Sequence, residues 1–229
     1  MEDKQYTQYY VAFLDILGFK EQVTRDPCGE ILKMYEFLGS MSEIYFGEGN
    51  EERKDNIKVK IMSDSICIYI NANIPNALDE LVKFCVVFQC NLLIREPCTF
   101  VRGGITCGDM YAKDDIIFGP ALTEAYLLEE KNAKVPRIIM CKNILDYGKS
   151  GMDEETRTAL DVYLFRDDDA FYALDYFAVL CAGDYEKTID RVNTTISNWL
   201  DATVNESIRQ KYLYVEKHFQ KYLKVKNNA

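Results

Sequence analysis

Several residue types and patterns are scarce in this chain of 229 residues, and each absence excludes a class of protein. It has a single histidine, His218, and its eight cysteines include no CxxC pair, so a soft-metal site such as a zinc site is not expected. The scattered cysteines are therefore predicted to be free thiols of a reducing compartment rather than a disulfide framework. No apolar run approaches the roughly 18 residues of a membrane span, and the N-terminus is polar and acidic, so we expect a cytoplasmic protein.

Clusters of positive charge are also missing. The chain carries 27 Lys and Arg against 37 Asp and Glu, a net charge of -10, and no Lys/Arg-rich run stands out. Binding along a nucleic-acid backbone or an anionic membrane needs such clusters, so neither is an expected partner. Hydrophobic residues, in contrast, make up 48% of the chain, enough for the core of a single globular domain.

The order of hydrophobic patterns in the first hundred or so residues predicts β-α-β-β-α-β. That order is typical of the ferredoxin-like sheet, in which the first strand lies at the centre beside the hairpin, and the expected fold class is α+β. The predicted segments are a strand at Tyr9–Leu14, a helix or helix pair within Lys20–Phe46, a charged loop at Gly47–Asn56, a hairpin at Ile57–Ile70, a helix capped by Asn76 and stopped by Pro97, and a strand at Cys98–Tyr111 broken by Gly103 and Gly104.

Beyond this core, the sequence predicts further strands and helices of the same domain. A helix begins at Gly119-Pro120, a short strand and helix follow Pro136, and two strands within Val162–Phe177 flank a turn, Asp167–Asp169, expected to be solvated. Residues 185 to about 224 read as helical. We expect residues 1–180 to form the catalytic domain and residues 181–229 a helical extension packed on it.

Two aspartates stand where turns follow predicted central strands. Asp15 ends the first strand and Asp64 lies in the hairpin turn, so the two ends can meet in a ferredoxin-like sheet. Paired carboxylates bind hard divalent cations, and the amides of Leu17, Gly18 and Phe19 can cradle phosphates at a helix start. The simpler alternative is that Asp15 caps a helix and Asp64 makes a turn. Their joint placement favours the metal site.

These motifs resemble those of the class III nucleotidyl cyclases. The family pattern F-x-D-I-x-G-F matches Phe13 to Phe19, and K-x-x-G-D matches Lys60 and Asp64 with Ser63 in place of glycine. The pattern R-x-G-I-x-x-G matches Arg102 to Gly108, and FGPALTEAYLLE resembles the later helix pattern W-G-x-x-V-N-x-A-x-R-L-E. The resemblance spans roughly residues 9 to 141.

The resemblance implies an enzyme that converts a nucleoside triphosphate to its 3′,5′-cyclic monophosphate and pyrophosphate. It implies two Mn²⁺ or Mg²⁺ ions per site and a head-to-tail homodimer whose sites form between subunits. The residues implied are Asp15, Asp64 and Arg102 for catalysis, Asp15, Ile16 and Asp64 for the metal, and Leu17, Gly18, Phe19 and Lys60 for the nucleotide.

The sequence also departs from the family pattern. Thr123 and Leu127 stand where the family helix has its asparagine and arginine, and the alignment gives Ile116 where adenylate cyclases have an adenine-reading aspartate. Without an acidic companion, Lys60 does not support an adenine-specific pattern. The chain resembles the pyrimidine cyclases of Pycsar antiphage systems, which implies UTP or CTP as substrate, cyclic UMP or cyclic CMP as product, and a separate effector. An inactive nucleotide sensor and a conventional adenylate cyclase are the alternatives.

Overall fold

The computed structural model describes residues 5–25, 28–47, 51–95, 98–182 and 186–226. The strands within these ranges are β1 Thr7–Ile16, β2 Ile57–Met62, β3 Ser65–Asn71, β4 Val101–Lys113, β5 Ile116–Phe118, β6 Ile138–Met140, β7 Leu164–Arg166 and β8 Tyr172–Leu174. The helices are α1 Phe19–Arg25, α2 Gly29–Phe46, α3 Glu51–Asn56, α4 Ala77–Ile94, α5 Pro120–Asn132, α6 Lys142–Lys149, α7 Glu154–Asp161, α8 Tyr176–Ala182, α9 Glu186–Ala202 and α10 Glu206–Lys226.

The described strands form one mixed sheet with β1 near its centre. The strand order is β2-β3-β1-β4-β6-β8-β7, with β5 paired to β4, and β1 runs antiparallel to both β3 and β4. This is the predicted ferredoxin-like order, extended on one side by β6, β8 and β7. The predicted α+β fold class is therefore confirmed.

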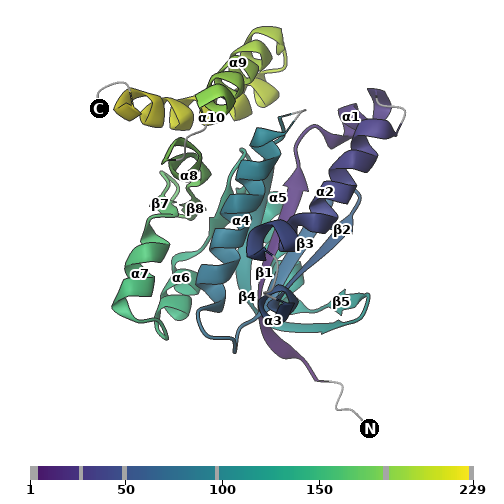
Figure 1. The fold of residues 1–229 in the computed structure, drawn as a ribbon, viewed down its shortest axis with the longest axis vertical. Coiled ribbons are helices and arrows are strands. Elements are labelled where there is room, and N and C mark those ends of the chain that lie inside the picture. Colours follow the sequence, from purple (N-terminus) through teal and green to yellow (C-terminus); the bar gives the residue numbers. More distant parts are fainter. Residues whose placement is uncertain (1–4, 26–27, 48–50, 96–97, 183–185, 227–229) are drawn as a thin grey trace.

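Helices cover both faces of this sheet (Figure 1). On one face α2 and α4 bury the larger core, which includes Leu14, Leu38 and Phe84. On the other face α5 packs on β4 and β1 and buries Phe13 and neighbouring side chains. Because successive residues of a strand point to opposite faces, β1 must be apolar at nearly every position, and it is.

The two glycines of β4 do not break the strand, contrary to the sequence-based expectation. β4 runs from Val101 to Lys113 without interruption. A Cβ atom on Gly104 would lie 2.7 Å from the Ala125 carbonyl oxygen and 3.0 Å from the Glu129 amide nitrogen, and one on Gly103 would lie 2.7 Å from the Phe13 carbonyl oxygen. Gly104 therefore lets the backbone of α5 lie directly against β4, whereas Gly103 leaves room for the neighbouring strand β1.

Two other local expectations are corrected. Part of the expected charged loop forms the helix α3. Arg53 of this helix pairs with Glu80 at 2.8 Å, and its guanidinium lies over the ring of Phe46. Asn76 precedes α4 in the left-handed conformation (φ 59°), and its side chain makes no capping hydrogen bond among the described residues. Pro97, the expected stop of this helix, lies outside the described residues.

The acidic turn between β7 and β8 is solvated only in part: the side chains of Asp168 and Asp169 are exposed, as expected, but that of Asp167 is buried. The side chain of Asp167 is 8% exposed, because it accepts hydrogen bonds from Arg137 and, at 2.6 Å, from the Tyr214 hydroxyl of α10. The Tyr222 hydroxyl, also on α10, donates to Asp175 just after β8. These bonds join α10 to the β7–β8 hairpin and to the residue that follows it. The division into a catalytic domain and a C-terminal extension stays a prediction.

All eight cysteines are free thiols, as predicted, and four of them are fully buried. No helix among the described residues has an apolar stretch long enough to cross a membrane.

The close packing of the α5 backbone on β4 leads to a testable prediction. Gly104→Ala should lower the free energy of unfolding by about 1–3 kcal/mol, since the added methyl group must push the α5 backbone away. Gly39→Ala is the matched control, because Gly39 lies on the exposed side of α2 with open space around its Cβ position, and it should raise stability by about 0.5–1 kcal/mol. Urea unfolding of both variants measures the difference, and equal stabilities would contradict this account of α5.

Candidate functional site

The end of β1 and the β2–β3 turn come together at one end of adjacent strands. Asp15 lies opposite Ser65 in the β1–β3 ladder, and the Ile16 amide donates to the Asp64 carbonyl oxygen at 2.8 Å. Two aspartates that are far apart in the sequence thus become neighbours, as the predicted strand order required. Their role as metal ligands stays a prediction.

A tyrosine of α2 holds the turn that carries Asp64. Ser63 adopts a left-handed conformation, φ 58°, which glycine normally favours, and its carbonyl oxygen accepts a hydrogen bond of 2.5 Å from the Tyr35 hydroxyl. Burial, and after it the charge of Asp64, raise the pKa of Tyr35. Nothing in the local sequence pattern around Tyr35 indicated this contact.

Arg102 lies between two carboxylates. It is the β4 residue opposite Asp15 in the β1–β4 ladder, and its Nε donates to Asp15 Oδ2 at 2.8 Å. The same Nε lies 2.9 Å from Oε1 of Glu129, which projects from α5. The sequence allowed two roles for Arg102: a phosphate ligand, or a strand residue paired with a surface carboxylate. In the structure it pairs with two carboxylates, and both are largely buried.

Glu129 is the buried acidic residue that the sequence-based reading did not single out. It is 3% exposed, and burial raises the pKa of its carboxyl to about 7; the charge of Asp15 adds to the rise and Arg102 opposes it. A signal was available, because Glu129 matches the final glutamate of the family helix pattern. What the pattern lacked was any indication that this side chain faces Arg102.

The predicted phosphate cradle is smaller than expected. The Leu17 amide donates to the Phe100 carbonyl oxygen at 2.9 Å, so it serves the fold and is not open to a ligand. Gly18 is exposed with φ 76°, and Phe19 begins α1, which leaves their two amides as the predicted donors. The Ile16 side chain is 2% exposed and apolar, so this residue can offer a metal ion only its backbone carbonyl oxygen.

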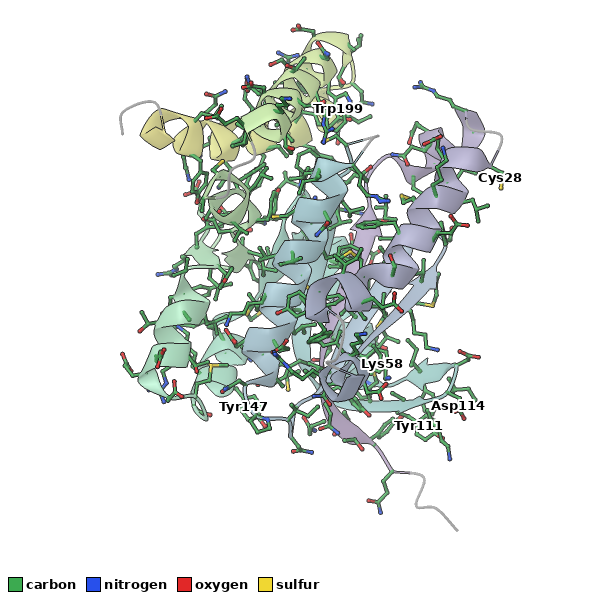
Figure 2. All side chains as sticks on the ribbon, in the orientation of Figure 1. Cys28, Lys58, Tyr111, Asp114, Tyr147 and Trp199 are labelled. Carbon is green, nitrogen blue, oxygen red and sulfur yellow. The ribbon has the colours of Figure 1, made fainter. Side chains whose placement is uncertain are left out.

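Lys60 lines an open hollow of about 650 Å³ on the α5 side of the sheet. The hollow is also lined by Tyr9, Lys58, Tyr69 and Asp114; Figure 2 labels Lys58 beside α3 and Asp114 at the tip of the β4–β5 hairpin. Lysines at 58 and 60 point the same way because alternate residues of β2 share a face. Cationic groups and aromatic rings together suit a nucleotide base or its phosphates.

Lys60 pairs with a carboxylate that the sequence comparison did not indicate. Its Nζ pairs with Asp115 Oδ1 at 2.6 Å, and the hydrogen bond to Lys60, followed by its charge, lowers the pKa of Asp115. The β4–β5 turn brings this aspartate back over β2, one position before the residue that the alignment chose. The premise that Lys60 stands without a carboxylate was therefore wrong.

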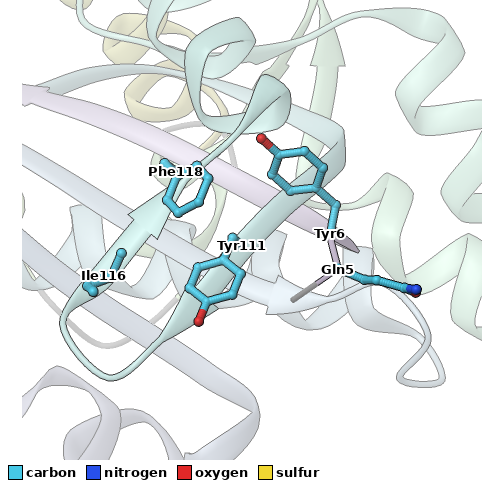
Figure 3. A pocket seen from close by; sticks show the side chains of 5 residues that line it. All are labelled: Gln5, Tyr6, Tyr111, Ile116 and Phe118. Atoms are coloured by element: carbon cyan, nitrogen blue, oxygen red, sulfur yellow. The ribbon is translucent and has the colours of Figure 1, made fainter. Parts of the chain in front are cut away.

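Ile116 itself lies elsewhere. It is 60% exposed and lines a second hollow of about 440 Å³ together with Tyr6, Tyr111 and Phe118 (Figure 3). None of the described residues lines both hollows. Ile116 is thus not placed to read a base held beside Lys60.

The family's asparagine and arginine have no substitute at the aligned positions of α5. The Thr123 hydroxyl donates to the Gly119 carbonyl oxygen of its own helix at 3.3 Å, and Leu127 is half-buried and apolar. Neither side chain offers the charged donor of the family pattern at these two places.

The donor set suits a hard divalent cation. No group of three or more His, Cys, Asp or Glu side chains converges as a metal site among the described residues, so the predicted site rests on Asp15 and Asp64. Mg²⁺ is commonly held by one or two carboxylates, with substrate phosphates and water completing its shell. Two carboxylates beside a backbone carbonyl of Ile16 fit that pattern.

Comparison with solved structures identifies the fold. The monomeric guanylyl cyclase domain of the RhoGC fusion protein from the aquatic fungus Blastocladiella emersonii superposes with a TM-score of 0.53 at 15% identity, covering 75% of this chain and 96% of that domain. The catalytic core of a rhodopsin-guanylyl cyclase with converted specificity, in complex with ATPalphaS, gives 0.53 at 16% identity, with 76% and 98% covered. The fold is that of a class III nucleotidyl cyclase domain. No protein-family model and no curated protein matches the sequence.

The buried Glu129 predicts a pH-dependent stability. In the folded state its carboxyl keeps its proton up to a pKa of about 7, against 4.5 for an ordinary glutamate, so the folded state binds more protons between these values. Its contribution is complete below 4.5 and is lost as the pH rises through 7. Relative to Glu129→Gln, wild type should lose roughly 2–3 kcal/mol of unfolding free energy across that range. Urea titrations at several pH values measure this, and a difference that does not change with pH would refute it.

Proposed function

We propose that this protein is a metal-dependent nucleotidyl cyclase, which converts a nucleoside triphosphate to a 3′,5′-cyclic monophosphate and pyrophosphate. The observation that carries the proposal is the meeting of Asp15 and Asp64 at the ends of adjacent strands on a cyclase fold. Arg102 and Lys60 lie on the same face of the sheet, since both share that face with Asp15 in the strand ladders.

In the reaction, the 3′-oxygen forms a bond to the α-phosphorus as the bond to the bridging oxygen of pyrophosphate breaks, and the 3′-hydroxyl proton is released. Asp15, Asp64 and the Ile16 carbonyl would hold Mn²⁺ or Mg²⁺, which would neutralise triphosphate charge and favour attack by the 3′-oxygen. The Gly18 and Phe19 amides would bind phosphate oxygens at the start of α1. Arg102 would place positive charge beside the phosphates.

We further propose that the active unit is a homodimer. The resemblance to class III cyclases implies sites formed between two subunits, with the Lys60 hollow of one facing the phosphate-binding residues of the other. Exposed aromatic side chains on this side of the sheet, Tyr126 on α5 and Phe118 on β5, are 42% and 50% exposed and fit a surface that a second copy covers. A symmetric pair would then hold two equivalent sites.

For the base, we propose a pyrimidine, with UTP or CTP as substrate. This choice rests on the resemblance to Pycsar cyclases, as does the proposed biological setting, antiphage defence through a separate effector that responds to the cyclic nucleotide. The Lys60–Asp115 pair favours a second candidate, a conventional adenylate cyclase, because a cation and a carboxylate together can pair with the edge of adenine.

Incubation with each of the four nucleoside triphosphates and Mn²⁺ decides between these substrates. We expect UTP or CTP to give the cyclic monophosphate with a kcat/KM at least about tenfold above those of ATP and GTP, which corresponds to one discriminating contact. Chromatography of the products measures this. ATP as the best substrate, with activity lost in Asp115→Asn, would select the adenylate cyclase instead.

Replacing Asp64 tests the proposed chemistry itself. Asp64→Asn removes a metal-binding charge without changing side-chain volume, so turnover should fall by at least about 100-fold while the protein stays folded. Asp146→Asn is the control and should keep wild-type activity, because Asp146 is an exposed residue of α6 that pairs with Lys142 of the same helix. Wild-type activity in folded Asp64→Asn would rule out the metal assignment, and nucleotide binding without product in wild type would favour a sensor.

A further inference from the structure

Arg102 is bound to one carboxylate and within reach of another. We propose that Glu129 is a positioning residue that acts through Arg102: it takes the guanidinium from Asp15 when a divalent cation binds there. The inference rests on the proposed function, since it assumes that Asp15 is a metal ligand. It goes further by giving a role to a buried residue outside the predicted site.

The first step of the argument is competition for Asp15. The Arg102 Nε donates to Asp15 Oδ2 at 2.8 Å and so occupies one of the two carboxylate oxygens. A divalent cation on the same carboxylate would be repelled by the guanidinium at this distance. Binding of the cation is therefore favoured by any group that draws Arg102 away from Asp15.

The second step is the unsatisfied oxygen of Glu129. Its side chain is 4% exposed, and Oε1 accepts no hydrogen bond among the described residues, although Arg102 Nε lies only 2.9 Å away. A buried carboxylate oxygen without a hydrogen bond is costly. A small rotation of Arg102 from Asp15 toward Glu129 would supply that bond, so the structure already contains a second acceptor for the same donor.

The third step is the rigidity of this acceptor. Glu129 lies on α5 where the helix backbone touches β4, and its amide nitrogen would be 3.0 Å from a Cβ atom on Gly104. Asp15 and Arg102 are neighbours across the β1–β4 ladder. The backbone positions that carry both carboxylates are thus set by packing, and the longer, more flexible Arg102 side chain would move between them.

Direct measurement of Mn²⁺ binding tests the inference without using activity. Titration of the whole chain is done at a pH above the Glu129 pKa of about 7, where this carboxyl is ionised, with free Mn²⁺ measured by electron paramagnetic resonance. It should give a Kd about tenfold higher for Glu129→Gln than for wild type, the lower end of what groups behind metal ligands contribute. Glu130→Gln is the matched control: it removes the same charge from the next, exposed position of α5 and should stay within about twofold of wild type.

Two further variants keep the test decisive. Glu129→Asp keeps the charge but shortens its reach, so it should lose part of the Mn²⁺ affinity, and it serves if Glu129→Gln does not fold. In an Arg102→Met background, adding Glu129→Gln should change the Kd by less than about twofold, because the residue through which Glu129 acts is gone.

The outcomes separate this inference from the proposed function. If wild type binds Mn²⁺ and neither Glu129 variant weakens binding, or if Glu129→Gln has its full effect without Arg102, the inference is overturned and the metal site stands. If wild type and Asp64→Asn bind Mn²⁺ equally, or neither binds it, the proposed metal site fails and the inference fails with it.

Discussion

The antiparallel pairing of β1 with both β3 and β4 is the constraint on which the site depends. One register places Asp15 opposite Ser65 on one side and opposite Arg102 on the other. A slip by one residue would turn Asp15 toward the large apolar core and Leu14 toward the site, at the cost of a buried charge. The apolar run of β1 therefore stabilises the sheet and also fixes which side chains meet at its end.

A second packing constraint brings α5 into this arrangement. Because Gly104 has no side chain, the helix lies with its backbone against the strand, and Glu129 reaches Arg102 from the opposite layer. The site is thus assembled from a sheet and a helix that are held together by backbone contact rather than by long side chains. Such support limits the movement of charged groups to the few that have flexible side chains.

The topology was predictable from the sequence because hydrophobic periods and turn residues report local structure. The meeting of Asp15 and Asp64 followed from strand order alone. Contacts that depend on exact three-dimensional placement were not predictable. The Lys60–Asp115 pair, for example, depends on where the β4–β5 turn folds back. The burial of Asp167 by Arg137 and Tyr214 likewise depends on a helix that lies 47 residues further along the chain. The loss of the family's asparagine and arginine at Thr123 and Leu127, in contrast, was visible in the sequence. In the structure neither side chain supplies a charged donor at these positions.

The position of β2 at the edge of the sheet gives its lysines a second role. β2 is an outermost strand of the sheet, with β3 as its only strand partner among the described residues. Open strand edges invite pairing with other chains and aggregation, and lysine is one of the residues that proteins use to prevent it. Lys58 and Lys60 thus add positive charge to the hollow, together with Lys113, and also protect the open edge of the sheet. A substitution of either β2 lysine would therefore change the charge of the hollow and the tendency of the protein to self-associate at the same time.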